Sequence, residues 1–189
     1  MPFDHFNLIA GFYDRAGQFI VTDQLLQWLA LPPDCFLLDA GGGTGRLAAA
    51  LSMWVGKVVV ADLSLGMLRQ ARNKSLVSVC TPAEHLPFQS ATIDRIIMVD
   101  ALHHVFDQKL TADELWRVLV PGGRILIIEP DIHQFAIRLL AIGEKIILMR
   151  SHFLSHERIT TLFRGSNAHV EVFNRKQDVI ILVEKVRQM

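Results

Sequence analysis

Short apolar runs alternate with helical patterns along most of this chain, and no other feature of the sequence constrains the fold as strongly. Runs rich in Val, Ile and Leu occupy residues 35–40, 57–62, 76–80, 95–100 and 123–130, with helical patterns between them at about 44–55, 64–73 and 109–119. Continuous apolar runs suit strands that are covered on both faces, so the alternation predicts a parallel sheet with helices on both sides. Two further runs, 169–174 and 178–186, are separated by a short polar turn and can only pair antiparallel. The expected fold is therefore α/β, with one seven-stranded, mostly parallel sheet and a C-terminal antiparallel hairpin.

The length of 189 residues suits a single domain that buries its own core. We expect helices within residues 5–30 to pack over the open end of the sheet, which makes residues 1–34 an N-terminal helical cap. Residues 35–130 carry the predicted ligand-binding core. Residues 131–189 are expected to add a helix of about 132–149, a shorter helix after Ser155 and the terminal hairpin.

Two helix ends in the core carry local signals. Ser64 is a candidate N-cap for the helix that begins beside it. The segment VPGGR (120–124) is expected to end the third helix, since proline and glycine stop a helix and turn the chain.

Charge and composition exclude several classes of protein. Lys and Arg together number 19, equal to Asp and Glu, so no net field favours nucleic acid as a partner. The N-terminal residues lack the basic start and long apolar core of a signal peptide, and no apolar run reaches the roughly 18 residues that a membrane span needs. The sequence therefore predicts a cytoplasmic protein without stable membrane insertion.

The two cysteines, Cys35 and Cys80, lie inside apolar stretches. They show neither C-x-x-C spacing nor a paired-histidine motif, so no disulfide framework or zinc site is predicted. We expect both to be buried free thiols of a reducing compartment.

The stretch LLDAGGGTGRLAAAL (37–51) places three consecutive glycines directly after the first predicted strand. Ligands of open parallel sheets bind beyond the carboxyl ends of the strands, and glycine lets the backbone approach a ligand closely. The dinucleotide fingerprint would require glycine at Arg46 or Leu47, and the phosphate-binding loop would require Gly-Lys-Ser or Gly-Lys-Thr, so both fail. What remains is Asp-x-Gly-x-Gly-x-Gly, although a tight turn without a ligand stays open.

Asp62 ends the second predicted strand. A carboxylate at this position can accept hydrogen bonds from both hydroxyls of a ribose. The alternative is that Asp62 only caps the helix that begins near Ser64.

With these residues the chain resembles the class I S-adenosylmethionine-dependent methyltransferases, in particular the branch with the ubiquinone and menaquinone C-methyltransferases. Four stretches carry the resemblance in the family's order: LLDAGGGTGRLA, VVVADLSLGMLRQAR, PAEHLPFQSATIDRIIMVDALHHV and LWRVLVPGGRILIIEP. They cover roughly residues 35–130. The resemblance implies a Rossmann-like fold and methyl transfer to a small-molecule acceptor. A non-catalytic protein that binds the same cofactor is the alternative from another class.

The resemblance also implies roles for individual residues around S-adenosylmethionine, which leaves as S-adenosylhomocysteine. The methionine portion would lie along Gly41, Gly43, Thr44 and Gly45, with Asp39 near its ammonium group. Asp62 would hold the ribose, Leu63 and Met67 would flank the adenine, Ala83 and Glu84 would close the adenine edge, Val99 and Asp100 would stand near the sulfonium, and Tyr13 would cover the cofactor.

One position departs from the family's pattern. Pro82 stands where the family usually has Asp before Ala-Glu, and proline offers neither a carboxylate nor a backbone N–H. We expect a backbone acceptor or Glu84 to replace that partner of the adenine amino group, or binding to be weaker.

Methyl transfer from a sulfonium is an in-line displacement of an already activated group, so positioning is the enzyme's main task. His103 and His104 are candidate general bases, with loop anchoring as the alternative role. Asp100, His103, His104 and His133 show no ligand spacing, so no metal is predicted. No Gly-x-Ser-x-Gly elbow is present, which disfavours a hydrolase.

The segment 131–165 follows the fifth strand and is expected to set acceptor specificity. Its amphipathic pattern, with basic residues at the edges, suits a hydrophobic acceptor or a membrane-surface substrate. Packing against the sheet or a partner subunit is the favoured explanation of this pattern, so a homodimer stays open.

Overall fold

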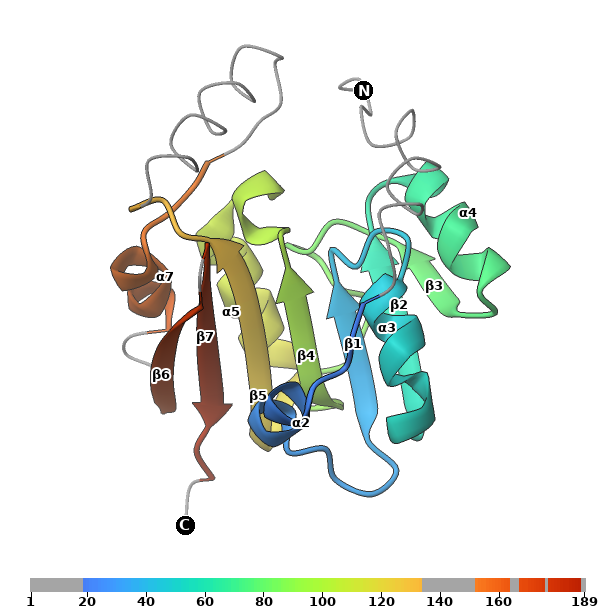
Figure 1. Cartoon of the computed structure of the whole chain (residues 1–189), viewed down its shortest axis with the longest axis horizontal. Coiled ribbons are helices and arrows are strands. Elements are labelled where there is room, and N and C mark those ends of the chain that lie inside the picture. Colours follow the sequence, from blue (N-terminus) through green and yellow to red (C-terminus); the bar gives the residue numbers. More distant parts are fainter. Residues whose placement is uncertain (1–18, 134–151, 164–166, 176, 188–189) are drawn as a thin grey trace.

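The computed structural model describes residues 19–133, 152–163, 167–175 and 177–187. These residues form a seven-stranded sheet with helices on both faces (Figure 1). The strands are β1 (Phe36–Ala40), β2 (Lys57–Asp62), β3 (Val77–Cys80), β4 (Ile93–Val99), β5 (Leu119–Pro130), β6 (Ala168–Arg175) and β7 (Asp178–Lys185). The helices are α2 (Asp23–Leu29), α3 (Arg46–Leu51), α4 (Leu65–Asn73), α5 (Gln108–Val118) and α7 (His156–Leu162), with short 3-10 turns η1 (Ser52–Trp54) and η2 (Leu102–His104).

The strand order is β3-β2-β1-β4-β5-β7-β6. The first five strands pair parallel, and β7 pairs antiparallel with both β5 and β6. The predicted mostly parallel sheet and terminal hairpin are confirmed. The chain moves outward from β1 through β2 to β3 and then returns to β4 on the other side of β1. The order therefore reverses between β1 and β4, where open α/β sheets bind ligands.

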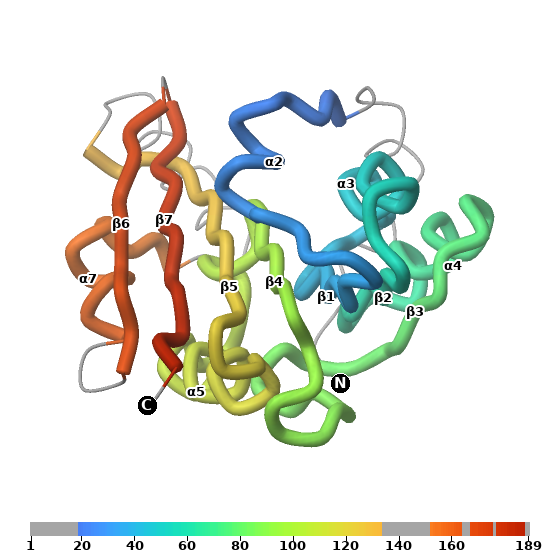
Figure 2. The backbone as a smooth tube through the Cα atoms, turned by 90° about the horizontal axis from the view of Figure 1, so that it is seen from below, coloured from blue at the N-terminus to red at the C-terminus, as the bar shows by residue number. Residues whose placement is uncertain are grey.

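Alternating side chains along the central strands build a core on each face of the sheet. Leu38 and Ile96 face the cluster under α5 and α7, whereas Leu37 and Ile97 face the cluster under α2 and α3. Figure 2 shows α2 and α3 on one side of the strands and α5 on the other. Because successive side chains of a strand point to opposite faces, strands covered on both sides need the continuous apolar runs seen in the sequence.

α2, the described part of the predicted N-terminal cap, lies on one face of the sheet beside the amino ends of β4 and β5, whereas residues 5–18 of that prediction lie outside the described residues. The guanidinium of Arg95 donates to the carbonyls of Leu29 (2.5 Å) and Ala30 (2.6 Å), and Arg124 donates to the carbonyl of Trp28 (3.1 Å). Positive charge at the last carbonyls stabilises the end of a helix. These two arginines thus bind the end of α2 near the starts of β4 and β5.

The segment 120–124 differs from its prediction as well. α5 ends at Val118, but pairing with β4 begins immediately at Leu119, so the segment lies inside β5. The register shifts at this point. Between the pairs Ile93↔Leu119 and Arg95↔Arg124, β5 advances by five residues while β4 advances by two. Proline and glycine end the helix as expected, but they form a bulge in a strand rather than a separate turn.

The other helices agree with the sequence more closely. The expected helix of 44–55 is α3 followed by the turn η1, and Ser64 is the N-cap of α4, accepting the N–H of Met67 at 3.5 Å. The predicted helix of 132–149 falls mostly outside the described residues. No helix in the described part of the chain is long and apolar enough to cross a membrane.

The two cysteines have different environments. Cys35 is buried as predicted, but Cys80 is exposed, which corrects the second prediction. Cys80 lies on β3, an edge strand of the sheet, where apolar neighbours in the sequence do not bring burial.

Candidate functional site

The glycine loop after β1 is held against the end of β2. The backbone N–H groups of Gly41 and Gly42 donate to the carbonyl of Ala61 at 2.7 and 3.3 Å. The N–H of Gly43 donates to Oδ2 of Asp62 at 2.8 Å. These bonds join the loop to the neighbouring strand at the point where the strand order reverses.

Gly41 and Gly43 both have left-handed backbone angles, with φ of 67° and 55°, but their surroundings differ. A Cβ on Gly41 would lie 2.6 Å from the Cβ of Ala101, whereas the nearest atom to a Cβ on Gly43 would be Sδ of Met67 at 3.8 Å. Gly41 is therefore required where the loop packs against the chain after β4. Gly43 keeps room on its outer side for a ligand.

Asp62 connects this loop to the start of α4. Its Oδ1 accepts the N–H of Ser64 at 2.8 Å, while Oδ2 accepts the N–H of Gly43. Ser64 itself supplies the side-chain cap of the helix. The helix-capping interpretation of Asp62 therefore accounts for one carboxylate oxygen, and the ribose role stays a prediction.

Asp39 lies directly beneath the loop. Its side chain is buried, and a Cβ on Gly42 would meet its carboxyl carbon at 2.4 Å. Burial raises the pKa of Asp39 to about 7, and the negative charge of Asp62 adds to the increase. A buried carboxyl group with this pKa is suited to a cationic ligand, which would stabilise its ionised form.

Asp100 directly follows β4 and has a left-handed backbone, with φ of 50°. Such a conformation is uncommon outside glycine, and it often marks a functional site. The residue as a whole is exposed, yet the surrounding protein removes enough water from its carboxyl group to raise the pKa of Asp100 to about 6. The charge of Glu129 raises this pKa further, and that of Arg46 lowers it.

Glu129 fixes the turn that carries the two candidate histidines. Its Oε1 accepts the N–H groups of Ala101 and Leu102 at 3.0 and 2.8 Å, and its Oε2 lies 2.5 Å from Nδ1 of His103. Glu129 was missed by sequence analysis, although an acid inside the apolar run RILIIEP was the available signal. The geometry is that of the loop-anchoring alternative for His103.

The environment of the two histidines limits acid–base chemistry. His103 is buried and stacks on Phe153, with ring centroids 4.2 Å apart and planes inclined by 15°. Burial, and then the neighbouring His103, lower the pKa of His104 to about 3. His104 is therefore neutral near pH 7 and is a weak base.

The loop after β3 holds the residues predicted at the adenine edge. Ala83 is half-buried, and Oε1 of the buried Glu84 accepts the N–H groups of Phe106 and Asp107 at 2.7 and 3.0 Å. The carbonyl of Pro82 accepts the N–H of His85 at 3.1 Å. Glu84 thus fixes the approach to α5, and its contact with adenine remains a prediction.

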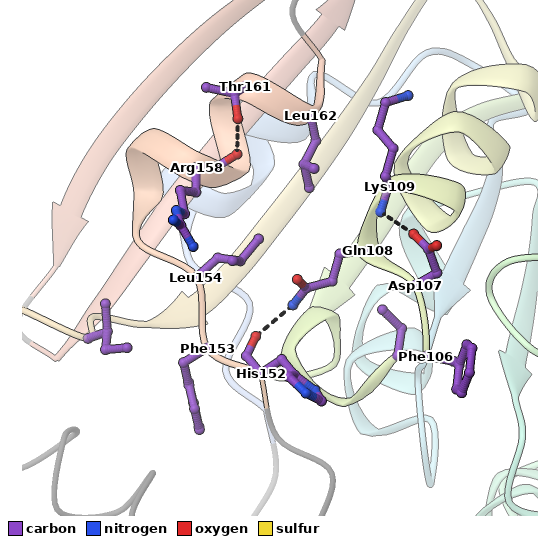
Figure 3. Close-up of a pocket in the computed structure, with 12 residues that line it drawn as sticks. Phe106, Asp107, Gln108, Lys109, His152, Phe153, Leu154, Arg158, Thr161 and Leu162 are labelled. Atoms are coloured by element: carbon purple, nitrogen blue, oxygen red, sulfur yellow. Dashed lines mark hydrogen bonds between the residues drawn. The ribbon is translucent and has the colours of Figure 1, made fainter.

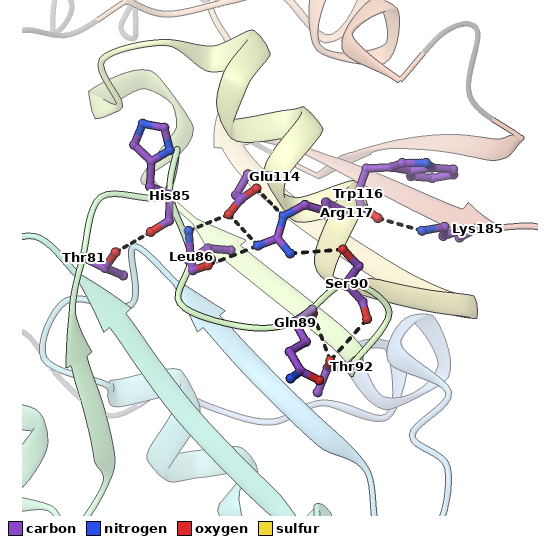
Figure 4. A network of polar contacts seen from close by, with 10 residues as sticks. All are labelled: Thr81, His85, Leu86, Gln89, Ser90, Thr92, Glu114, Trp116, Arg117 and Lys185. Carbon is purple, nitrogen blue, oxygen red and sulfur yellow. Dashed lines mark hydrogen bonds and ion pairs between the residues drawn. The ribbon is translucent and has the colours of Figure 1, made fainter.

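Hydrogen bonds from two paired charges on α5, which the sequence analysis did not identify, hold the same loop (Figure 4). Glu114 and Arg117 pair at 2.7 Å, which lowers the pKa of Glu114. Glu114 accepts the N–H of Leu86 at 2.7 Å, and Arg117 donates to the carbonyl of Leu86 at 3.1 Å and to Oγ of Ser90 at 3.3 Å. The i, i+3 spacing of the two charges was the signal that could have revealed it.

The remaining predicted residues differ in exposure. Thr44 and Met67 are buried, Val99 is half-buried, and Leu63 is 66% exposed. Tyr13 lies outside the described residues. The structure brings the predicted residues of β1, β2 and β4 to one edge of the sheet, with Gly45 closing the loop through an N–H bond to the carbonyl of Gly42 (2.9 Å).

A pocket of about 650 Å³ opens beside this edge, between the start of α5 and α7 (Figure 3). Gln108 links its two walls, because Nε2 donates to the carbonyls of Leu102 (3.1 Å) and His152 (2.6 Å). No residue of the glycine loop lines it. The lining combines apolar side chains with cationic and polar ones: Val105, Phe106, Asp107, Gln108, Lys109, Ile132, His152, Phe153, Leu154, Arg158, Thr161 and Leu162.

The fold and this edge define an α/β protein of the nucleotide-cofactor type, with a glycine turn after β1 and an acid at the end of β2. Comparisons with known proteins agree. Residues 38–127 match the family described as a methyltransferase domain. The ubiquinone/menaquinone biosynthesis C-methyltransferase of Haemophilus ducreyi is 32% identical over 142 residues, which cover 66% of this chain and 55% of that protein. Residues 38–127 thus carry a methyltransferase-domain match, and the chain is similar in sequence and fold to S-adenosylmethionine-dependent methyltransferases.

Solved structures share the whole fold at low sequence identity. A chain of the Haloferax volcanii complex between the Trm112 methyltransferase activator and a protein assigned as a methyltransferase gives a TM-score of 0.80 at 18% identity, covering 99% of this chain and 100% of that one. A SAM-dependent methyltransferase from Aquifex aeolicus gives 0.77 at 19%, covering 97% and 100%. The chain spans little more than half the length of the curated relatives it matches.

Proposed function

We propose that this chain binds S-adenosylmethionine at the carboxyl edge of β1, β2 and β4 and transfers its methyl group to a small-molecule acceptor. The acidic character of the glycine loop carries this proposal. A phosphate-binding loop offers free N–H groups to an anion. Here the N–H of Gly43 is bonded to Asp62, and the carboxyl group of Asp39 lies under Gly42. Such a loop disfavours phosphate and favours a ligand that carries an ammonium and a sulfonium group.

The exposed and buried groups of this edge fit the two ends of such a cofactor. The methionine portion would lie along the loop, with its ammonium group near Asp39, while the ribose would exchange hydrogen bonds with Asp62. Leu63 is an exposed apolar side chain directly after Asp62, which suits a contact with adenine. Met67 and Ala83 would complete the adenine edge, and Val99 and Asp100 would stand nearest the sulfonium.

The bound cofactor supplies an activated methyl group, so the protein must mainly align the acceptor and exclude water. We infer that Glu129 and His103 are positioning residues, since Glu129 fixes both the backbone after Asp100 and the ring of His103. The low pKa of His104 argues against that residue as the principal base. An acceptor whose attacking atom needs little deprotonation suits this arrangement.

The pocket between α5 and α7 is the proposed acceptor site. None of its lining residues belongs to the glycine loop, and the N–H of His152 donates to the carbonyl of His103 at 2.7 Å, which connects the pocket wall to the turn after β4. Phe153, Leu154 and Leu162 offer apolar surface, and the exposed Arg158 offers a cation at the rim. These side chains suit a largely apolar acceptor with an acidic or polar group.

Calorimetric titration with S-adenosylmethionine, S-adenosylhomocysteine and NAD tests the cofactor. We expect one binding site for each sulfur compound and no binding of NAD. Asp62→Ala should weaken binding about 20-fold through loss of charged hydrogen bonds to ribose. Ser64→Ala is the matched control: it should lower stability by about 1 kcal/mol through the helix cap and leave affinity unchanged. If Asp62→Ala bound the cofactor as tightly as the unmodified chain does, the role of Asp62 would be limited to its hydrogen bonds with Gly43 and Ser64.

Methyl transfer is then measured with isotopically labelled cofactor and a panel of small phenols, quinols, amines and prenylated acids. Labelled product from at least one acceptor is the expected result. Cofactor binding without transfer to any of them would instead favour the non-catalytic alternative. Absence of binding to either sulfur compound would contradict the proposal at its first step.

A further inference from the structure

Three metal-ligating side chains meet outside the site described above, where β5 ends and α7 begins. His133 follows β5 by three residues, and His156 and Glu157 open the first turn of α7. Nε2 of His133 lies 3.6 Å from Oε2 of Glu157, and Nε2 of His156 lies 3.1 Å from Oε1 of the same carboxylate. The potential ligand atoms all lie within 4.8 Å of one another, and the centroids of the two imidazole rings are 5.6 Å apart.

We propose that His133, His156 and Glu157 form a binding site for a divalent transition metal, with Zn²⁺ as the best-suited ion. Two imidazoles and one carboxylate are a ligand set that Zn²⁺ uses, leaving a fourth position for water. Tetrahedral bonds of about 2.1 Å place neighbouring ligand atoms about 3.4 Å apart. The two observed distances to the carboxylate bracket that value, so only the two imidazoles must approach each other.

The local backbone already holds the ligands near this arrangement. The N–H of His133 donates to Oδ1 of Asp131 at 3.0 Å, which fixes the turn after β5. The N–H of Ile159 bonds the carbonyl of Ser155 at 3.0 Å, so both α7 ligands belong to a formed helical turn. Small side-chain rotations therefore suffice to close the site.

Hydrogen-bond partners of the ligating histidines set the affinity of the site. Nδ1 of His156 is buried and has no hydrogen-bond partner among the described residues. Outer partners of metal-ligating histidines contribute about 10- to 100-fold in affinity. We therefore expect a dissociation constant in the micromolar range rather than that of a structural zinc site.

A metal at this site would tie two segments that both line the pocket. Ile132 precedes His133, and Arg158 follows Glu157, and both face the pocket between α5 and α7. Metal binding should thus stiffen one wall of that pocket. The inference does not depend on the proposed methyl transfer, because none of the three ligands belongs to the cofactor edge.

An ordinary ion pair is the alternative, and the chain contains a matched example. On β6, Nε2 of His169 lies 3.4 Å from Oε1 of Glu171, with both side chains exposed. No third ligand joins this pair in the described part of the chain. His169→Ala therefore removes an exposed histidine from a His–Glu pair without touching the proposed site.

The test is calorimetric titration of the full, tag-free chain with Zn²⁺ alone, with Mg²⁺ as a second ion. We expect one site for Zn²⁺, a rise in melting temperature on its addition, and no binding of Mg²⁺. His133→Ala and Glu157→Gln change largely exposed side chains and should each weaken Zn²⁺ binding at least 10-fold. His169→Ala should bind as the unmodified chain does. The same titration in Cys80→Ser should also be unchanged, since the exposed thiol is not a ligand.

Several results would overturn the proposal. Unchanged affinity in His133→Ala would show that the three side chains do not act together. An equal loss in His169→Ala would indicate scattered surface binding, and loss in Cys80→Ser would move the site to the thiol. Absence of Zn²⁺ binding to the folded chain would show that the two histidines and Glu157 form ion pairs and not a metal site.

Discussion

The two halves of the carboxyl edge are built in different ways. On the half formed by β1 and β2, the important groups are neighbours in sequence, from Asp39 through Gly43 and again at Asp62. On the half beyond β4, contacts join distant segments: Glu129 to His103, and His152 to the same turn. The first half is acidic and close to the backbone, whereas the second combines apolar side chains with the cations of Lys109 and Arg158. The half of β1 and β2 suits the proposed cationic cofactor and is called the cofactor half below. The half beyond β4 suits the proposed acceptor and is called the acceptor half.

The largest expected effect lies on the cofactor half and depends on pH. Asp39 has a pKa of about 7 in the folded chain and an ordinary value of 3.8, a difference worth about 4 kcal/mol. The folded state holds the extra proton, so stability should fall as pH rises from about 4 to about 7 and level off above. Affinity for S-adenosylmethionine should rise over the same range, because the ionised carboxylate pairs with ammonium.

Urea unfolding and calorimetry at a series of pH values measure both trends. Asp39→Asn should remove most of the fall in stability, leave the smaller contribution of Asp100, and weaken cofactor binding at every pH. If the stability of Asp39→Asn depended on pH as that of the unmodified chain does, Asp39 would not be the source of the pH dependence predicted for the cofactor half.

The next effect tests the acceptor half. Glu129→Ala leaves the N–H groups of Ala101 and Leu102 buried without their acceptor and should cost about 3 kcal/mol in the free energy of unfolding. Glu129→Gln keeps an oxygen for these groups and should cost about 1 kcal/mol. In transfer assays, Glu129→Gln should lower kcat more than it changes cofactor affinity. Equal losses in both quantities would mean that the two halves are not separable at this residue.

A smaller difference is expected inside the glycine loop. Gly41→Ala combines an unfavourable left-handed backbone with a contact of 2.6 Å to Ala101 and should cost about 3 kcal/mol. Gly43→Ala has the backbone cost alone, about 1 kcal/mol. Urea unfolding compares the two directly. Similar costs would contradict the assignment of packing to Gly41 and ligand access to Gly43.

The smallest effect concerns the rim of the proposed acceptor pocket. Arg158→Gln should raise the KM for an acidic acceptor about fivefold, since an exposed ion pair contributes about 1 kcal/mol. Cofactor affinity should stay the same. Arg175→Gln, on the exposed strand β6, is the matched control and should change neither quantity. A KM that responds equally to both variants would place the acceptor elsewhere.

Much of the cofactor half was predictable, because its chemistry is local. The strand ends at Ala40 and Asp62 follow from apolar runs that stop at an acid or glycine, and parallel strands bring such ends to one edge. The hydrogen bond of 2.8 Å from the N–H of Gly43 to Oδ2 of Asp62 follows from the pairing of β1 with β2. Local signals were thus enough to name both residues.

Elsewhere local signals failed for identifiable reasons. Cys80 has apolar neighbours but lies on an edge strand, and only the strand order shows that one side of β3 is uncovered. The partner of His103 depends on the β4–β5 register, in which Val99 faces Ile128 and so brings Glu129 beside the turn. The position of α2 depends on Arg95, which acts on a helix 65 or more residues earlier in the chain.

By itself, the sequence determined the alternation of elements, the parallel sheet and the glycine edge, because hydrophobic periodicity and backbone freedom act over a few residues. The tertiary structure decided which charges lie together: Glu129 with His103, Glu114 with the loop after β3, and His133 with His156 and Glu157. These contacts depend on strand order and register, so side chains far apart in sequence meet only once the sheet has formed. The acceptor half of the molecule is accordingly the part that only the fold could define.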